Sequence, residues 1–286
     1  MNIEYNQIFP SGVATKEAFC NRDEERRILA RNIKSGRHTL LVAPRRYGKS
    51  SLVKKVIDEQ KVPSGEADLF VAIDEHRVQQ RILSGVNAII KSIKSPVAMK
   101  LEIVAQYFYS ISSKLTVGVK GLQLTFDADV ESDPATNILD ILSALEVLLK
   151  KKNKKAVLFI DEIQIIGKLK NACAIEGAIR SVAQTSTHLF LVFSGSRRHL
   201  VNEMFNDDDR PLYKLCEQIA LERISAESYQ KHLSALSVLK WPTTMPPNVI
   251  EHILSITKRH PYYVNRLCFE LWQRDKMPGI NDVETD

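Results

Sequence analysis

A glycine-containing loop between an apolar run and an amphipathic segment constrains the fold of this chain more than any other feature. The run from His38 to Ala43 reads His-Thr-Leu-Leu-Val-Ala, which is typical of a strand buried on both faces, as in parallel sheets. The segment from Ser50 to Glu59 places its apolar residues at helical spacing: Leu52, Val53, Val56 and Ile57. The chain therefore predicts a strand, a loop and a helix in that order.

The loop itself matches the pattern G-x-x-x-x-G-K-[ST], except that Ala43 replaces the first glycine. An alanine fits there if its backbone conformation is an ordinary one. In this pattern the backbone N–H groups and the helix N-terminus bind phosphate oxygens, Lys49 reaches the β and γ phosphates, and Ser50 offers its hydroxyl to Mg²⁺. The loop therefore predicts a nucleotide site, and the binding residues that we expect are Pro44, Arg45, Arg46, Tyr47, Gly48, Lys49, Ser50 and Ser51.

Two adjacent carboxylates, Asp161 and Glu162, follow the apolar run that starts at Ala156. Ligands of open α/β sheets bind at the carboxyl ends of the strands, so Asp161 is placed to hold Mg²⁺ together with Ser50. Glu162 can orient or deprotonate an attacking water. The competing interpretation is that the pair only ends a strand and begins a turn. Taken with the loop, the pair favours ATP hydrolysis over transfer to a small acceptor, with Lys49 and Glu162 as catalytic residues.

Strand and helix patterns alternate along the rest of the first 224 residues, which predicts a parallel α/β sheet. The segment of about 75–133 reads as an insertion, with helices at Arg81–Lys94 and Lys100–Ser110 and a strand pair within Leu115–Phe126. A helix capped by Asp133 follows. The further core strands that we expect are Asp68–Asp74, Ala156–Asp161, Leu189–Ser194 and Gln218–Arg223. The later helices that we expect are Asn171–Ser186, Ala226–Leu239, Pro247–Lys258 and Pro261–Arg274.

Charge and hydropathy limit the partners of the chain. The net charge of +6 and the pI near 9.0 allow nucleic acid as a partner without requiring it. The lysines of Lys150–Lys155 form either a nucleic-acid patch or a solvent-exposed helix end that the helix dipole favours. Apolar stretches are far shorter than the ~20 residues of a membrane span, and the polar segment Met1–Gln7 fits no signal peptide, so a cytoplasmic protein without a membrane partner is expected.

Six segments spread along the chain together resemble the archaeal-type ATPases, the STAND branch of the AAA+ P-loop ATPases, which are similar to archaeal origin-recognition initiators. The segments are Phe19-x-x-Arg22-Asp23-x-Glu25, Pro44–Leu52, Leu158–Gln164, Phe193–Ser196, Pro211–Tyr213 and His260–Tyr263. The resemblance implies a sheet of order 5-1-4-3-2, a helical lid and an ATP-dependent conformational switch. It also implies that Arg22 lies near the adenine, that Ser196 or Ser194 senses the γ-phosphate, and that His260 and Pro261 reach the nucleotide.

The resemblance has two departures. The family continues Pro-Leu-Tyr with Gly-Arg, whereas here Lys214 and Leu215 follow, so an arginine from that loop is in doubt, with Arg197, Arg198 or Arg210 as substitutes. Arg266 is a further lid candidate. The winged-helix module common in the family is not carried over. We expect an N-terminal segment at 1–20, an ATPase core at 21–224 and a helical lid at 225–286.

Three functions remain open from the sequence. The first is an ATPase that hydrolyses ATP slowly with Mg²⁺ and acts as a switch, with ATP and ADP as ligands and a protein partner or a second copy as its target. The second is a DNA-associated ATPase, such as a loader or mobile-element helper. The third is an ATP-binding scaffold without hydrolysis, which the missing arginine after Tyr213 favours.

Overall fold

The computed structural model of the chain describes residues 5–93, 115–118, 123–126 and 133–285. Two compact units are distinguished, and each is described by itself. The helical unit comprises Met1–Arg27, Arg45–Lys55 and Leu221–Asp286, and the sheet unit comprises Ile28–Pro44 and Val56–Ala220. The domain boundaries after residues 20 and 224 stay predictions.

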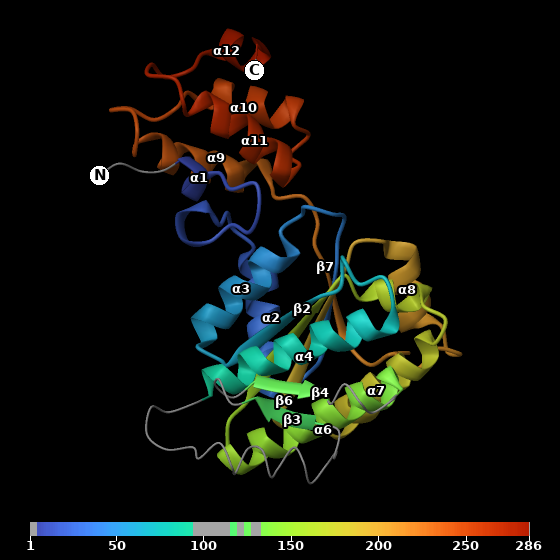
Figure 1. Ribbon diagram of the computed structural model, residues 1–286. Helices are drawn as coiled ribbons and strands as arrows, with labels where there is room; N and C mark the ends of the chain where they lie inside the picture. Colours follow the sequence, from blue (N-terminus) through green and yellow to red (C-terminus); the bar gives the residue numbers. More distant parts are fainter. Residues whose placement is uncertain (1–4, 94–114, 119–122, 127–132, 286) are drawn as a thin grey trace. The chain divides into compact units, whose positions relative to one another are not determined.

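The elements follow one another in an alternating order through the sheet unit and become purely helical afterwards (Figure 1). Their bounds are α1 Tyr5–Ile8, η1 Lys16–Ala18, α2 Asp23–Ser35, β1 Thr39–Val42, α3 Lys49–Gln60, β2 Ser64–Asp68, α4 Glu75–Ser92, β3 Leu115–Gly118, β4 Gln123–Phe126, α6 Pro134–Lys152, β5 Ala156–Asp161, η2 Ile163–Lys168, α7 Ala172–Thr185, β6 Leu189–Gly195, α8 Arg198–Asn206, β7 Glu217–Ala220, α9 Ala226–Ser237, α10 Pro247–Ile256, α11 Pro261–Leu271 and α12 Ile280–Thr285.

A five-stranded parallel sheet in the order β2-β5-β6-β1-β7 is the centre of the sheet unit. When these strands are numbered in chain order, the arrangement is 2-3-4-1-5, which confirms the predicted 5-1-4-3-2 sheet. The three inner strands consist of buried residues throughout, apart from the half-buried Asp161 at the end of β5. Parallel strands that are covered on both faces need such apolar runs, so these three strands could be predicted from the sequence.

The predicted second strand at Asp68–Asp74 is wrong, because the strand at the sheet edge is β2, at Ser64–Asp68. The apolar residues Phe70, Val71 and Ile73 are exposed instead, in a turn that follows the strand. The reason is a close approach of two backbones. A Cβ on Gly65 would lie 1.9 Å from the carbonyl oxygen of Gly85 in α4, so only a glycine lets the helix contact this strand.

Helices α4, α6 and α7 pack side by side along one face of the sheet (Figure 1). The longest of them, α6, starts as predicted, with Asp133 accepting a hydrogen bond of 2.9 Å from the Thr136 N–H and Pro134 in the first turn. Its apolar side is fully buried, and it ends at Asn153 in the left-handed conformation. These helices hold the sheet in place from one side.

The predicted strand pair in the insertion is confirmed, since β3 and β4 pair antiparallel with Leu115 opposite Phe126. The helix predicted at Lys100–Ser110 lies outside the described residues. In the helical unit, α9, α10 and α11 correspond to the three helices expected after residue 225, and they pack around Trp272. Among the residues that the structure describes, no helix has both the length and the apolar character that a membrane span needs.

Candidate functional site

The glycine loop takes a left-handed backbone conformation at Gly48. Gly48 has a φ of +87°, and a Cβ there would meet nothing within 4 Å, so the backbone angle and not the space demands a glycine. Ala43, at the position of the missing glycine, is not among the residues with positive φ. Helix α3 begins at Lys49, which is 5% exposed, and Leu52 N–H already bonds to the Gly48 carbonyl at 2.9 Å. The positive end of the helix dipole therefore lies at the loop.

The N-terminal segment of the helical unit holds this loop from one side. The guanidinium of Arg22 is buried, and it donates to the Tyr47 carbonyl at 3.3 Å and to Glu25 at 2.9 Å. Ser51 Oγ accepts a hydrogen bond of 2.9 Å from the Ala14 N–H. Arg22 is thus in direct contact with the loop.

Aromatic residues at the start of α11 contact the loop as well. The ring of Tyr47 lies edge-on to that of His260, with centroids 4.9 Å apart, and its hydroxyl accepts a hydrogen bond of 3.3 Å from Arg223. The guanidinium of Arg46 lies 3.9 Å from the ring centroid of Tyr262, in cation–π geometry. Burial, with the charges of Arg223 and Arg46, lowers the pKa of His260, so this ring is neutral at neutral pH.

A pocket opens between the loop and these segments within the helical unit. Its polar side consists of Arg22, Gly48 and Ser51, and its apolar side is formed by residues such as Ile224 and Pro261. Tyr229 also lines it, and its buried hydroxyl lacks a hydrogen-bond partner among the described residues. The cavity holds about 50 Å³, so as it stands it has room for water and not for a nucleotide base.

The acidic pair lies in the sheet unit, where the two serines of Ser-Gly-Ser each bind one carboxylate. Ser194 Oγ donates to Asp161 Oδ1, and Ser196 Oγ donates to Glu162 Oε2 at 2.6 Å. Glu162 is buried and has a φ of +58°, a conformation uncommon for a residue with a side chain. Ser194 lies in β6 and Ser196 directly follows it, so both serines are at the carboxyl end of the strand that pairs with β5.

Gln164 is a site residue to which the sequence analysis assigned no role. Its amide nitrogen donates to Glu162 Oε2 and lies 3.5 Å from Ser196 Oγ, and the side chain is 2% exposed. The sequence feature that could have indicated a role for Gln164 is its position in the segment Leu158–Gln164, two residues after Glu162.

The end of β1 lies next to the end of β6, with Val42 opposite Gly195 and the Ala43 N–H 3.4 Å from the Gly195 carbonyl. Strand β6 separates β1 from β5, so the strand that leads to Lys49 and the strand that ends at Asp161 are not direct neighbours. The convergence of these two residues on one polyphosphate stays a prediction.

The arginine candidates differ in their surroundings. Arg210 is bound to the fully buried Glu176 and lies 3.3 Å from Glu203, so it serves as an internal counterion. Arg197 and Arg198 are exposed. Arg266 is 68% exposed and lies 3.5 Å from Glu270 on the same helix.

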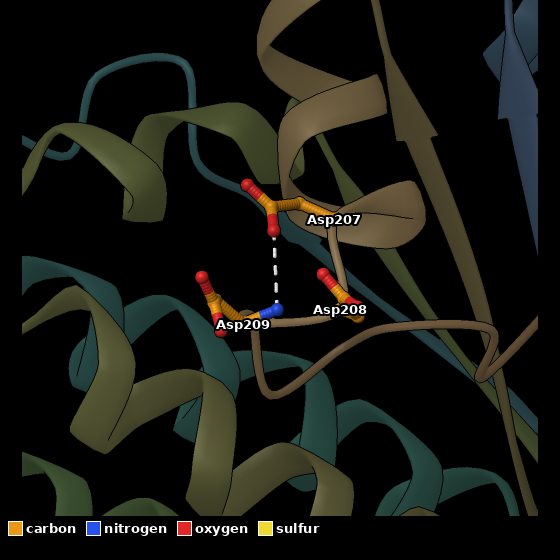
Figure 2. A group of neighbouring side chains, drawn as sticks. All are labelled: Asp207, Asp208 and Asp209. Carbon is orange, nitrogen blue, oxygen red and sulfur yellow. Dashed lines mark hydrogen bonds between the residues drawn. The ribbon is translucent and has the colours of Figure 1, made fainter.

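Three exposed carboxylates, Asp207, Asp208 and Asp209, follow α8 (Figure 2). Asp207 accepts a hydrogen bond of 3.1 Å from the Asp209 N–H, which is the pattern of an Asx turn. Exposed carboxylates are well solvated by water, so we assign this cluster to the turn and not to a metal.

No protein-family model matches the sequence, and no curated protein matches it. Solved structures do match. A Walker-type ATPase of Pyrococcus abyssi has a TM-score of 0.68 at 18% identity, over 96% of this chain and 72% of that one. The Orc2 protein of Aeropyrum pernix, solved as ADPNP–ADP complexes, has a TM-score of 0.63 at 14% identity, over 98% of this chain and 70% of that one.

A third match is the Orc1 protein of Aeropyrum pernix in complex with DNA, with a TM-score of 0.60 at 13% identity, over 99% of this chain and 68% of that one. At these identities the likeness shows the fold alone. The chain thus has the P-loop NTPase fold, a parallel sheet flanked by helices and followed along the chain by helices alone.

Proposed function

We propose that the chain binds ATP with Mg²⁺ and hydrolyses it to ADP and phosphate. The observation that carries the proposal is the loop at Gly48, which starts helix α3 and borders a pocket with the buried Arg22 on its wall. A glycine loop at a helix N-terminus, beside a buried arginine, fits the phosphate end of a nucleotide. The AAA+ fold supports the same conclusion.

The roles follow from the chemistry of each group. The loop from Pro44 to Ser51 binds the phosphates, with Lys49 as the cation at the β and γ positions. Arg22, His260 and Pro261 surround the base, which the contacts of Tyr47 with Arg22 and His260 support. The neutral state of His260 suits contact with an uncharged purine.

Magnesium fits the donor set that the chain offers. Ser50 supplies a hydroxyl and Asp161 a carboxylate, and Mg²⁺ prefers such oxygen ligands together with phosphate and water. When bound, the ion neutralises charge on the β and γ phosphates. Ser194 donates a hydrogen bond to Asp161, so we assign it the role of orienting the carboxylate that binds Mg²⁺. Ser196 donates to Glu162, so we assign it to the γ-phosphate end of the site.

Hydrolysis, as opposed to mere binding, depends on Glu162. Its carboxylate accepts a proton from the attacking water while the new bond to the γ-phosphorus forms and the bond to the leaving ADP oxygen breaks. Ser196 donates to the γ-phosphate or to that water. Slow turnover and a conformational switch, as in the STAND branch, complete the proposal, with a cytoplasmic location and a protein partner or second copy as the target.

The test compares wild type with Lys49→Ala and Glu162→Gln. ATP and Mg²⁺ should raise the melting temperature of wild type and of Glu162→Gln but not of Lys49→Ala, because only ligand binding to the folded state stabilises it. Phosphate release should be lost in both variants. Equal melting of all three proteins with and without saturating ATP would contradict ATP binding, and release that survives in Glu162→Gln would contradict its role as base.

A DNA-associated function is the second candidate, favoured by the lysines of Lys150–Lys155. All six positions are exposed, and the Lys155 ammonium lies 3.3 Å from the Lys34 carbonyl, which brings another lysine to the cluster. Such a cluster should bind phosphates through counterion release. Retention of duplex DNA that requires ATP and falls with salt supports this function, whereas no retention at low salt removes it.

A further inference from the structure

Helices α10, α11 and α12 of the helical unit form the walls of an open groove (Figure 1). Its volume is about 720 Å³, which is far more than a single water needs. Helix α11 lines it with four residues at the spacing i, i+3, i+4 and i+7, so one face of this helix borders the groove over two turns. These residues are Tyr263, Arg266, Leu267 and Glu270.

The groove has an apolar floor and exposed apolar side chains beside it. Val283 is buried and Leu267 is half-buried, and both pack into the core around Trp272. Ile256 is 49% exposed and Tyr263 is 56% exposed, and both line the groove. Large apolar groups that stay in contact with water and adjoin one another mark an interaction site, whereas isolated ones do not.

Opposite charges stand on opposite walls of the groove. Arg266 on α11 is 68% exposed, and Glu284 on α12 is 61% exposed. Each has an ion pair within the helical unit, since Arg266 Nε lies 3.5 Å from Glu270 and Glu284 lies 3.3 Å from His252 Nε2. Ion pairs that are this exposed contribute little in water, so both charged groups can take a new partner at small cost.

These features fit a second copy of the chain better than a small molecule or a nucleic acid. Small-molecule sites enclose most of the ligand surface, whereas this groove is open to solvent. Phosphates would meet the carboxylates of Glu270 and Glu284, and like charges in contact are costly. A patch that carries both signs of charge, with recessed and exposed apolar parts, is complementary to itself, as an interface about a twofold axis requires.

We infer that the groove is the contact face of a symmetric homodimer. In this dimer Tyr263 of each copy enters the groove of the other, and Arg266 of each copy pairs with Glu284 of the other. Burial of the exposed apolar groups supplies the free energy of association, and the two ion pairs fix the register. The inference goes beyond the proposed function, because neither ATP binding nor hydrolysis enters it.

The experiment is sedimentation of the full chain without nucleotide, at concentrations up to about 100 μM, where contacts of micromolar affinity are saturated. The mass of wild type should approach twice the 32.4 kDa of one chain. Ile256→Lys should weaken the dimer about tenfold or more, because it removes apolar area and places a charge in the contact. Ile73→Lys is the matched control, since Ile73 is even more exposed but belongs to the sheet unit, and it should dimerise like wild type.

Charge reversal tests the pairing itself. Arg266→Glu brings two carboxylates together at both ion pairs of the dimer, and Glu284→Arg brings two guanidinium groups together, so each variant alone should be monomeric. An equimolar mixture of the two variants should dimerise like wild type, because every contact then joins opposite charges. Both positions are exposed, so the melting temperature of each variant should stay near that of wild type and exclude misfolding as the cause.

Three outcomes would overturn the inference. Wild type that stays monomeric at the highest concentration leaves the groove to a different occupant. A dimer that survives in Ile256→Lys and in both charge-reversal variants has its contact elsewhere on the chain. If wild type dimerises but the mixture of Arg266→Glu and Glu284→Arg stays monomeric, the twofold pairing of these two residues is refuted.

Discussion

Ser196 donates a hydrogen bond of 2.6 Å to Oε2 of Glu162, which couples the candidate sensor directly to the candidate base. The neighbouring Ser194 bonds instead to Asp161, so the Ser-Gly-Ser segment serves two carboxylates with different tasks. The structure thereby separates two serines that the sequence left as alternatives, and it shows which carboxylate each one contacts.

Replacement of Ser196 by Ala should lower kcat by about tenfold to a hundredfold, because a donor to the transferring phosphate or its water is lost. The KM for ATP should change little. Phosphate release at saturating ATP is the measurement, and Ser92→Ala, which removes a hydroxyl bonded to the Ile89 carbonyl, is the matched control. An unchanged or raised kcat in Ser196→Ala would exclude it as the sensor.

Replacement of Gly48 by Ala should destabilise the chain by about 1–2 kcal/mol, because its φ of +87° is unfavourable for a residue with a Cβ. Nucleotide-induced stabilisation should disappear as well, since the loop would relax away from this conformation. Gly12→Ala is the control, because a Cβ there also meets nothing within 4 Å but no positive φ is required. Thermal melting with and without ATP measures both effects; equal behaviour of the two variants would contradict the backbone argument.

Replacement of Gly65 by Ala should cost about 3 kcal/mol or more of unfolding free energy, because the new Cβ would overlap the Gly85 carbonyl oxygen. Edge strand β2 should lose its packing on α4 first. Chemical denaturation gives the free energy, and hydrogen exchange of the β2 amides locates the loss. In the control Gly177→Ala, a Cβ meets nothing within 4 Å in helix α7, so stability should hold or rise. If the β2 amides of Gly65→Ala exchange as slowly as those of wild type, the close approach of Gly65 and Gly85 is disproved.

His38 should make stability depend on pH. Its Nε2 lies 2.8 Å from the Ala183 carbonyl, and its Nδ1 accepts a hydrogen bond of 3.0 Å from the Leu191 N–H, so the ring must be neutral. Burial lowers the pKa of His38. A lowered folded-state pKa contributes stability that is present above about pH 6.5, the ordinary value, and is lost as the pH falls through the folded-state value.

The unfolding free energy should therefore be smaller at pH 5 than at pH 7.5, and the difference should shrink in His38→Phe. This variant should also be less stable at pH 7.5 by about 1–3 kcal/mol, since the Leu191 N–H loses its acceptor. Urea denaturation at the two pH values is the measurement. His199→Phe, at an exposed position, should keep the wild-type pH dependence of the unfolding free energy. If His38→Phe also keeps that dependence, His38 is not its source.

Local sequence determined those parts of the protein that short-range physics controls. The buried strands β1, β5 and β6 were readable because both of their faces are covered, so every position must be apolar. The start of α6 was readable because Asp133 and Pro134 satisfy the needs of a helix N-terminus within a few residues. The phosphate loop could be predicted from the sequence because its glycine and its lysine stand at a fixed spacing. The glycine acts through its backbone angles and the lysine through its charge.

Only the tertiary structure decided the features that depend on two distant segments approaching each other. The position of β2 follows from the contact of Gly65 with Gly85, which overrides the stronger apolar pattern four residues later. The pairing of Ser196 with Glu162 likewise needs β6 beside β5. The periodicity of apolar residues indicates which side chains are buried. Close packing and hydrogen bonding between strands depend instead on distances between segments far apart in the chain, which a local pattern does not determine.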